Sequence, residues 1–118
     1  MRQMLRFIGV LAMLFAFSGW HASPAGAQQY PSQQIRIIVS LAPGGVADIV
    51  ARAFAAKLTE QGKTAVVENR TGGGGIIGAD AAAKSAPDGY TLFQANAAHT
   101  INPALTRELP YDPQRAFT

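Results

Sequence analysis

The 118-residue sequence contains no cysteine and only two histidines, and these absences exclude several kinds of site. Without cysteine the chain has no disulfide framework, no lipid-anchoring cysteine near its amino terminus and no thiol nucleophile. A zinc-type site of Cys and His ligands is equally excluded, since two histidines do not complete one. No serine occupies the Gly-x-Ser-x-Gly pattern of a nucleophile elbow. We therefore expect a protein that is not an enzyme and that binds no metal and no cofactor.

The first residues have the order of a secretory signal peptide. Arg2 and Arg6 precede an apolar run of 11 residues, 7–17, and the small residues Ala25-Gly26-Ala27 follow it. A membrane-spanning helix needs about 20 apolar residues, so this run is too short for a permanent membrane anchor. We predict a signal peptide over residues 1–27, cleaved after Ala27, and an exported mature chain.

Cleavage of this segment changes the charge balance of the chain. The whole sequence has ten basic and seven acidic residues, and losing Arg2 and Arg6 leaves eight basic residues. A mature chain with so small an excess of positive charge has no basic stripe for nucleic acid, and export argues the same way. We therefore expect no nucleic-acid partner.

The mature chain alternates between strand-like and helix-like segments with short connections. The β-branched run at residues 35–39 predicts a buried parallel strand. A helix is expected from residue 46 to about residue 61, with Gly62 as its stop. Its apolar face should comprise Ile49, Val50, Ala53, Phe54 and Leu58. The remaining expected elements are a strand within residues 63–69, a helix over 76–85 and a strand over 90–95. This alternation predicts an α/β fold, a parallel sheet covered by helices with right-handed crossovers.

The most informative local feature is the turn between the first strand and the first helix. Pro43-Gly44-Gly45 ends the strand, and the helix begins at once. Such a turn directs unpaired backbone N–H groups and the positive end of the helix dipole at one point, which suits a carboxylate or a phosphate. In parallel α/β sheets the loops after the strands share one edge, where ligands bind. Here those loops are residues 41–48, 70–78 and 96–102.

Three features near these loops have two interpretations each. Asp48 either caps backbone N–H groups at the start of the helix or takes part in function. Glu68-Asn69-Arg70 ends the second strand, and solvated pairs or turn-locking contacts are more plausible there than catalysis. His99 is either a packing or surface residue or a contact to a ligand.

The glycine-rich loop raises the possibility of a nucleotide site. Gly73, Gly75 and Gly78 match the spacing of a dinucleotide fingerprint, but no acidic residue follows at the distance where a ribose partner belongs. Gly62-Lys63-Thr64 lacks the upstream glycine of a P-loop. A glycine turn that serves packing or an unrelated anion site is therefore favoured over a nucleotide-binding enzyme.

An ordered set of short motifs runs through the whole mature chain. They are Tyr30-Pro31, Ile37-Ile38-Val39, Pro43-Gly44-Gly45-x-x-Asp48, Ala51-Arg52, Val66-Val67-Glu68-Asn69-Arg70, Gly74-Gly75-x-x-Gly78-Ala79, Ala86-Pro87-Asp88-Gly89-Tyr90-Thr91-Leu92, Ile101-Asn102-Pro103-Ala104-Leu105 and Leu109-Pro110-Tyr111-Asp112-Pro113. In this order they resemble the motifs of the Bug proteins, the extracytoplasmic solute receptors of tripartite tricarboxylate transporters.

The resemblance implies a periplasmic binding protein of the type II-like fold. Two α/β lobes of such a protein close over a small carboxylate and present it to a membrane permease. Family members are much longer than this chain, so we expect residues 28–118 to be only part of lobe one and to bind weakly or not at all alone. The alternatives are a non-binding remnant or an interaction fragment and, less in keeping with the residues, the glycine-loop enzyme.

The resemblance also names candidate ligand contacts. In the family the loop after the first strand holds a carboxylate through main-chain groups. Carried onto this sequence, the candidates are Ala42, Gly44, Gly45, Val46 and Ala47. Val46 stands where many relatives have a hydroxyl residue, so only its backbone N–H can contribute. Asn96 and His99 are further candidates from the third loop, which also departs from the usual family sequence.

Overall fold

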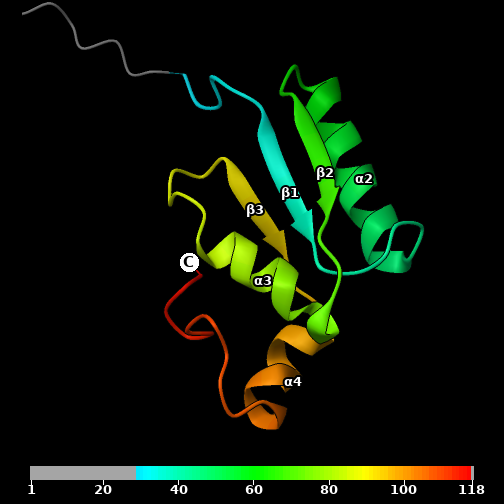
Figure 1. The fold of residues 1–118 in the computed structure, drawn as a ribbon. Coiled ribbons are helices and arrows are strands. Elements are labelled where there is room, and N and C mark those ends of the chain that lie inside the picture. The colour runs from blue at the N-terminus through cyan, green and yellow to red at the C-terminus, as the bar shows by residue number, and fades with distance from the viewer. Residues whose placement is uncertain (1–28, 118) are drawn as a thin grey trace, which may run out of the picture.

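The computed structural model describes residues 29–117, so the predicted signal peptide lies outside the described residues. The described chain contains strands β1 (Ile35–Val39), β2 (Ala65–Asn69) and β3 (Thr91–Gln94), which form one parallel sheet in the order β2-β1-β3 (Figure 1). β1 is the central strand, in agreement with its β-branched sequence, and Ile38 and Val39 are fully buried in it. The predicted α/β class and the three strands are confirmed.

Helical segments occupy the connections between these strands, and one more helix follows β3. They are α2 (Val46–Glu60), the glycine turn η2 (Gly73–Gly75), α3 (Ile76–Ala83) and α4 (Ala97–Leu105). On one face of β1, Ile37 and Val39 pack with alanines of α2. On the other face, Ser40 lies against Gly78 of α3. Because neighbouring side chains of a strand point to opposite faces, α2 and α3 cover opposite sides of the sheet.

The packing face of α2 differs from the predicted one. Ala51 and Ala55 are buried against the sheet, with Ala47 and Leu58 packed beside them. Val50 and Phe54 are instead 53% and 51% exposed, and of the predicted face only Leu58 is among the residues that pack on the core. The sequence contains two stripes at helical spacing, and the alanine stripe packs because small side chains let the helix axis approach the strands closely.

The third loop was predicted wrongly. Residues 96–102 were expected to connect two elements, yet α4 begins at Ala97, directly after β3. Asn96 is its N-cap, and the Asn96 Oδ1 atom accepts a hydrogen bond from the N–H of Ala98 at 2.9 Å. Pro103 lies inside this helix. Pro103, in the last turn of this nine-residue helix, concealed the helix, because proline usually ends helical patterns.

The segment after α4 runs back toward the carboxyl end of α3, as Figure 1 shows in red. Tyr111 is buried there, and its ring and that of Phe117 pack around His99 of α4. Phe93 of β3 completes this aromatic cluster, with ring centroids 5.4 Å from His99 and 5.3 Å from Phe117. The cluster ties the end of the described chain to β3.

Candidate functional site

The ends of the three parallel strands lie at the same edge of the sheet. In register, Val39 of β1 is opposite Asn69 of β2 and Gln94 of β3. The three segments that follow these residues therefore leave the sheet side by side, at the lower end of the strands in Figure 1. The strand order also reverses at β1, and ligands of open α/β sheets bind beside such a reversal.

The loop between β1 and α2 ends in a helix start that has no side-chain cap. Gly45 is the N-cap residue, and no side chain caps the helix there. The first intrahelical bond runs from the N–H of Ile49 to the carbonyl of Gly45 at 3.0 Å. Among the residues 29–117 no acceptor bonds the N–H groups of Val46, Ala47 or Asp48. These three donors, at the positive end of a 15-residue helix, are free to receive an anion.

The candidate residues of this loop contribute unequally. Ala42, Gly44, Gly45 and Val46 are exposed, and Ala47 is half-buried. Gly44 has a φ of +82°, which favours glycine, and its N–H is already bonded to Asp48. The N–H of Gly45 contacts the carbonyl of Ala42 at 3.4 Å. The free donors are therefore those of Val46 and Ala47, together with Asp48, while the glycines shape the turn.

Asp48 is a buried acceptor and is not a free carboxylate. Its Oδ2 atom accepts hydrogen bonds from the N–H of Gly44 and from Arg52 Nε, both at 2.9 Å. Its Oδ1 atom accepts from Asn69 Nδ2 at 3.0 Å. The hydrogen bond from Arg52, followed by those from Gly44 and Asn69, lowers the pKa of Asp48 to about 2, although burial opposes the shift. Asp48 accepts from one backbone N–H group, that of Gly44 in the turn before the helix, and it does not cap the helix itself.

Asn96 and His99 have packing partners of their own. Asn96 Nδ2 donates to the buried Ser40 Oγ at 2.8 Å, while Asn96 Oδ1 caps α4, so both polar ends of the side chain are engaged. His99 lies in the aromatic cluster with Phe93 and Phe117, and its Nδ1 atom is buried without a hydrogen-bond partner in the described chain. A ligand contact from either residue stays a prediction.

The glycine-rich loop serves close packing. A Cβ atom on Gly78 would lie 2.7 Å from the Cβ of Ser40 and 2.7 Å from the carbonyl oxygen of Arg70. No side chain fits there, because real Cβ contacts are essentially never this short. Asn102 of α4 donates to the carbonyl of Gly74 at 3.0 Å and fastens the turn. Packing thus accounts for the glycine at position 78 of the apparent fingerprint.

Sequence reasoning missed the part that Arg52 takes in this site and foresaw that of Asn69 only as a turn-locking contact. Asn69 Nδ2 donates both to Asp48 and, at 3.1 Å, to the carbonyl of Leu41. The four-residue spacing of Asp48 and Arg52 on one helix was a usable signal for their ion pair. Asn69 lies 21 positions from Asp48, and only the expectation of turn-locking contacts after β2 anticipated its role.

Within residues 29–117, no group of three or more His, Cys, Asp or Glu side chains is arranged to hold a metal ion. The same part of the chain has no helix whose length and apolar character would let it cross a membrane.

The comparison with protein families decides the relationship. The family described as "Tripartite tricarboxylate transporter family receptor" matches residues 48–118. The chain belongs to this receptor family. Protein BugT of Bordetella pertussis is 41% identical over 111 residues, which cover 92% of this chain and 34% of BugT. The chain thus spans about one third of the length of this relative.

Solved structures show the same fold. The structure of the periplasmic binding protein BugD has a TM-score of 0.69 and 37% identity, covering 75% of this chain and 30% of BugD. MatC from Rhodopseudomonas palustris with bound malate has a TM-score of 0.69 and 35% identity, covering 75% of this chain and 31% of MatC. The predicted fold, part of a periplasmic binding protein of the α/β type, is confirmed.

Proposed function

We propose that this chain forms part of the first lobe of a periplasmic solute receptor and that it binds a small carboxylate at the start of α2. The observation that carries the proposal is the set of free N–H groups of Val46, Ala47 and Asp48 at an uncapped helix start. The binding of malate by MatC, a relative of the same fold, supports the choice of a carboxylate.

Backbone donors are well suited to such a ligand. A hydrogen bond to a charged group contributes about 1.5–3 kcal/mol when well formed, and the helix dipole adds up to about 1 kcal/mol at an exposed site. Neither contribution needs a side chain, so the loss of a hydroxyl at Val46 leaves the anchor for a carboxylate intact. Side chains elsewhere would then decide between one carboxylate and another.

Binding by this chain alone should be weak. The loop is exposed, with Val46 80% accessible, so water competes for every donor. The chain spans about a third of BugT, and we propose that closure by further parts of a receptor supplies the remaining contacts and excludes water. Val50 and Phe54 on the exposed face of α2, beside a groove of about 990 Å³ along β3, are apolar surfaces that such parts would cover.

Location and partners belong to the same proposal. The predicted signal peptide, residues 1–27, would export the chain to the periplasm, which is in keeping with its likeness to BugD, a periplasmic binding protein. A membrane permease of the tripartite tricarboxylate type would receive the solute, in keeping with the family of the chain. The protein would act as a receptor and not as an enzyme, without nucleic acid or a permanent membrane anchor.

A malate titration followed by NMR tests the proposal at the level of single amides. We expect malate to shift the amide signals of Val46, Ala47 and Asp48 in a saturable manner, and the uncharged diamide of malate to leave them unchanged. Equal responses to the two compounds, or malate responses confined to other residues, would contradict a carboxylate site at α2.

A further inference from the structure

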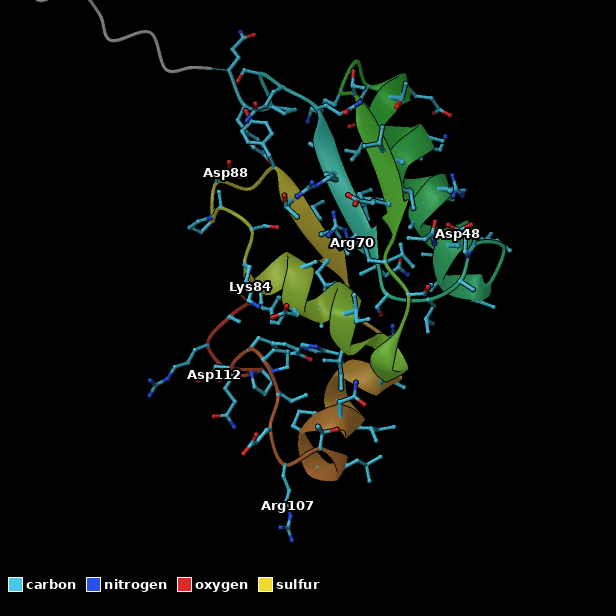
Figure 2. The ribbon with its side chains drawn as sticks, viewed as in Figure 1. Asp48, Arg70, Lys84, Asp88, Arg107 and Asp112 are labelled. Carbon is cyan, nitrogen blue, oxygen red and sulfur yellow. The ribbon has the colours of Figure 1, made fainter. Side chains whose placement is uncertain are left out.

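Four residues form a connected network of hydrogen bonds behind the exposed turn. This network, the loop latch, consists of Gly44, Asp48, Arg52 and Asn69. One carboxylate oxygen of Asp48 accepts hydrogen bonds from Gly44 and Arg52, and the other accepts one from Asn69. Arg52 Nη2 closes the ring by donating to Asn69 Oδ1 at 3.3 Å. Figure 2 shows Asp48 at the end of α2 where the loop enters the helix.

The loop latch connects both ends of the turn to the sheet. Asn69 is the last residue of β2, and its Nδ2 group holds the Leu41 carbonyl at the start of the turn as well as Asp48 at its end. The N–H of Arg70, the next residue, bonds the carbonyl of Val39 at 2.8 Å, which fixes the end of β2 against β1. The turn is therefore anchored at two points to a strand that is not its sequence neighbour.

The charge of Asp48 has an unexpected sign for this position. A carboxylate beside a site for anions repels the ligand, so removing it should strengthen anion binding on electrostatic grounds alone. Asp48 is nevertheless only 3% exposed and turned toward Gly44, Arg52 and Asn69, with Arg52 as its counter-ion. Its two oxygens are thus occupied by three donors of the turn, the helix and β2.

We propose that Asp48 and Asn69 are positioning residues, which hold the turn before α2 in the shape that points the Val46 and Ala47 N–H groups at one carboxylate. This inference rests on the proposed function, since it concerns the same site. The loop latch touches no ligand itself. Its effect passes through Gly44 and Leu41, whose backbone it fixes.

Two variants and one control test the loop latch in the complete chain. Asp48→Asn keeps the shape of the side chain but leaves one acceptor oxygen for three donors. Asn69→Ala keeps the charge of Asp48 and removes both bonds made by Nδ2. Glu60→Gln is the control, because Glu60 is an exposed acid of the same helix that pairs with Lys57. The malate response of the Val46 and Ala47 amides is the measurement.

We expect Asp48→Asn and Asn69→Ala each to weaken malate binding about five- to tenfold, the equivalent of one lost hydrogen bond, and Glu60→Gln to leave it unchanged. The sign is decisive for Asp48→Asn. If only its charge mattered, this variant would bind malate more tightly and Asn69→Ala would bind it as before. Tighter or equal binding by a folded Asp48→Asn would overturn the proposal. If Asp48→Asn does not fold, unchanged malate binding by Asn69→Ala would overturn the proposal.

Hydrogen exchange at Gly44 separates the loop latch from the proposed function. In both variants the Gly44 amide should exchange about tenfold faster than in the unmodified chain, because its turn has lost an anchor. This measurement needs no ligand. If malate shifted no amide signal while the Gly44 amide of the variants exchanged faster, the carboxylate site would be refuted. The proposal that Asp48 and Asn69 anchor the turn would still hold. Unchanged exchange in both variants would overturn the loop latch whatever the malate titration gives.

Discussion

The starts of α2 and α4 lie at the same edge of the sheet and differ in how they are capped. Each helix follows a parallel strand at the same edge of the sheet. Asn96 closes the start of α4 with its own side chain, whereas Gly45, at the equivalent position of α2, has none. The acid nearest the start of α2, Asp48, bonds the preceding turn and not the free donors. Two of the first three N–H groups of α4 are thus bonded by Asn96, whereas the first three of α2 have no acceptor within residues 29–117.

The buried Ser40, which follows β1, links the two helix starts. Its Oγ atom accepts from the cap of α4, its backbone precedes the turn into α2, and Gly78 of α3 lies against it. A disturbance at Ser40 should therefore affect both helix starts, while a disturbance at either cap should stay local.

Gly78→Ala should have the largest effect on stability. The new Cβ would lie 2.7 Å from Ser40 and from the carbonyl of Arg70, and forcing a methyl group into such a contact costs about 1–3 kcal/mol. Chemical denaturation measures the change in the free energy of unfolding. Gly45→Ala is the matched control, since a Cβ there meets only the Ala42 carbonyl at an ordinary 3.4 Å. Equal losses in the two variants would argue against close packing at Gly78.

Asn96→Ala should have the next largest effect. It removes the N-cap of α4 and the hydrogen bond to Ser40, and loss of an N-cap alone costs about 1 kcal/mol. Asn102→Ala removes one exposed side-chain bond, to Gly74, from the same helix and serves as the control. The free energy of unfolding should fall more in Asn96→Ala than in Asn102→Ala. The reverse order would show that the cap does not hold α4 in place.

The elements around these helix starts also show how much of the fold can be predicted from the sequence alone. The β-branched run of β1 and the Pro43-Gly44-Gly45 turn are local signals, and both predicted their elements with correct starts. Packing by the glycine-rich loop was among the favoured interpretations, but the partners of Gly78, which are Ser40 and Arg70, lie elsewhere in the sequence and could not be named. The helix α4 was missed because of Pro103. The large apolar side chain of Phe54 was predicted to pack against the sheet, whereas the small Ala51 is the residue of α2 that fits there.

The candidate site also has one part that the sequence predicts and one part that it does not. Its donors were predicted, because a glycine turn that enters a helix leaves N–H groups free whatever surrounds it. Which of them stay free could not be predicted, since Asp48 takes the N–H of Gly44 only where Asn69 and Arg52 hold its carboxylate in place. That arrangement requires β2 beside β1, a consequence of the tertiary fold.

Acid should weaken the chain through Asp48. The pKa of its carboxyl is about 2 in the folded state, below the ordinary value of 3.8, so ionised Asp48 stabilises the fold. This stabilisation is fully present above the ordinary pKa and is lost as the pH falls from about 4 to about 2. The free energy of unfolding should therefore fall less steeply across this range in Asp48→Asn than in the unmodified chain. Parallel curves for the two would contradict the hydrogen-bonded state of Asp48.

Gly45→Asn should change stability least and tests the comparison most directly. It gives α2 the cap that α4 has, and the backbone of Gly45 is extended, as that of Asn96 is, so the side chain can accept from the N–H of Ala47. Replacing a glycine cap by asparagine should raise the free energy of unfolding by a few tenths of a kcal/mol, roughly the measured preference for asparagine at this position. Malate binding, followed by the response of the Val46 and Ala47 amides, should weaken about five- to tenfold, because one of the three donors for the ligand now serves the helix. Gly62→Asn places the same side chain just past the other end of α2, at a φ of +76° that asparagine tolerates, and should retain the response. A full malate response in Gly45→Asn would mean that the open helix start does not hold the carboxylate and that the difference between α2 and α4 has another cause.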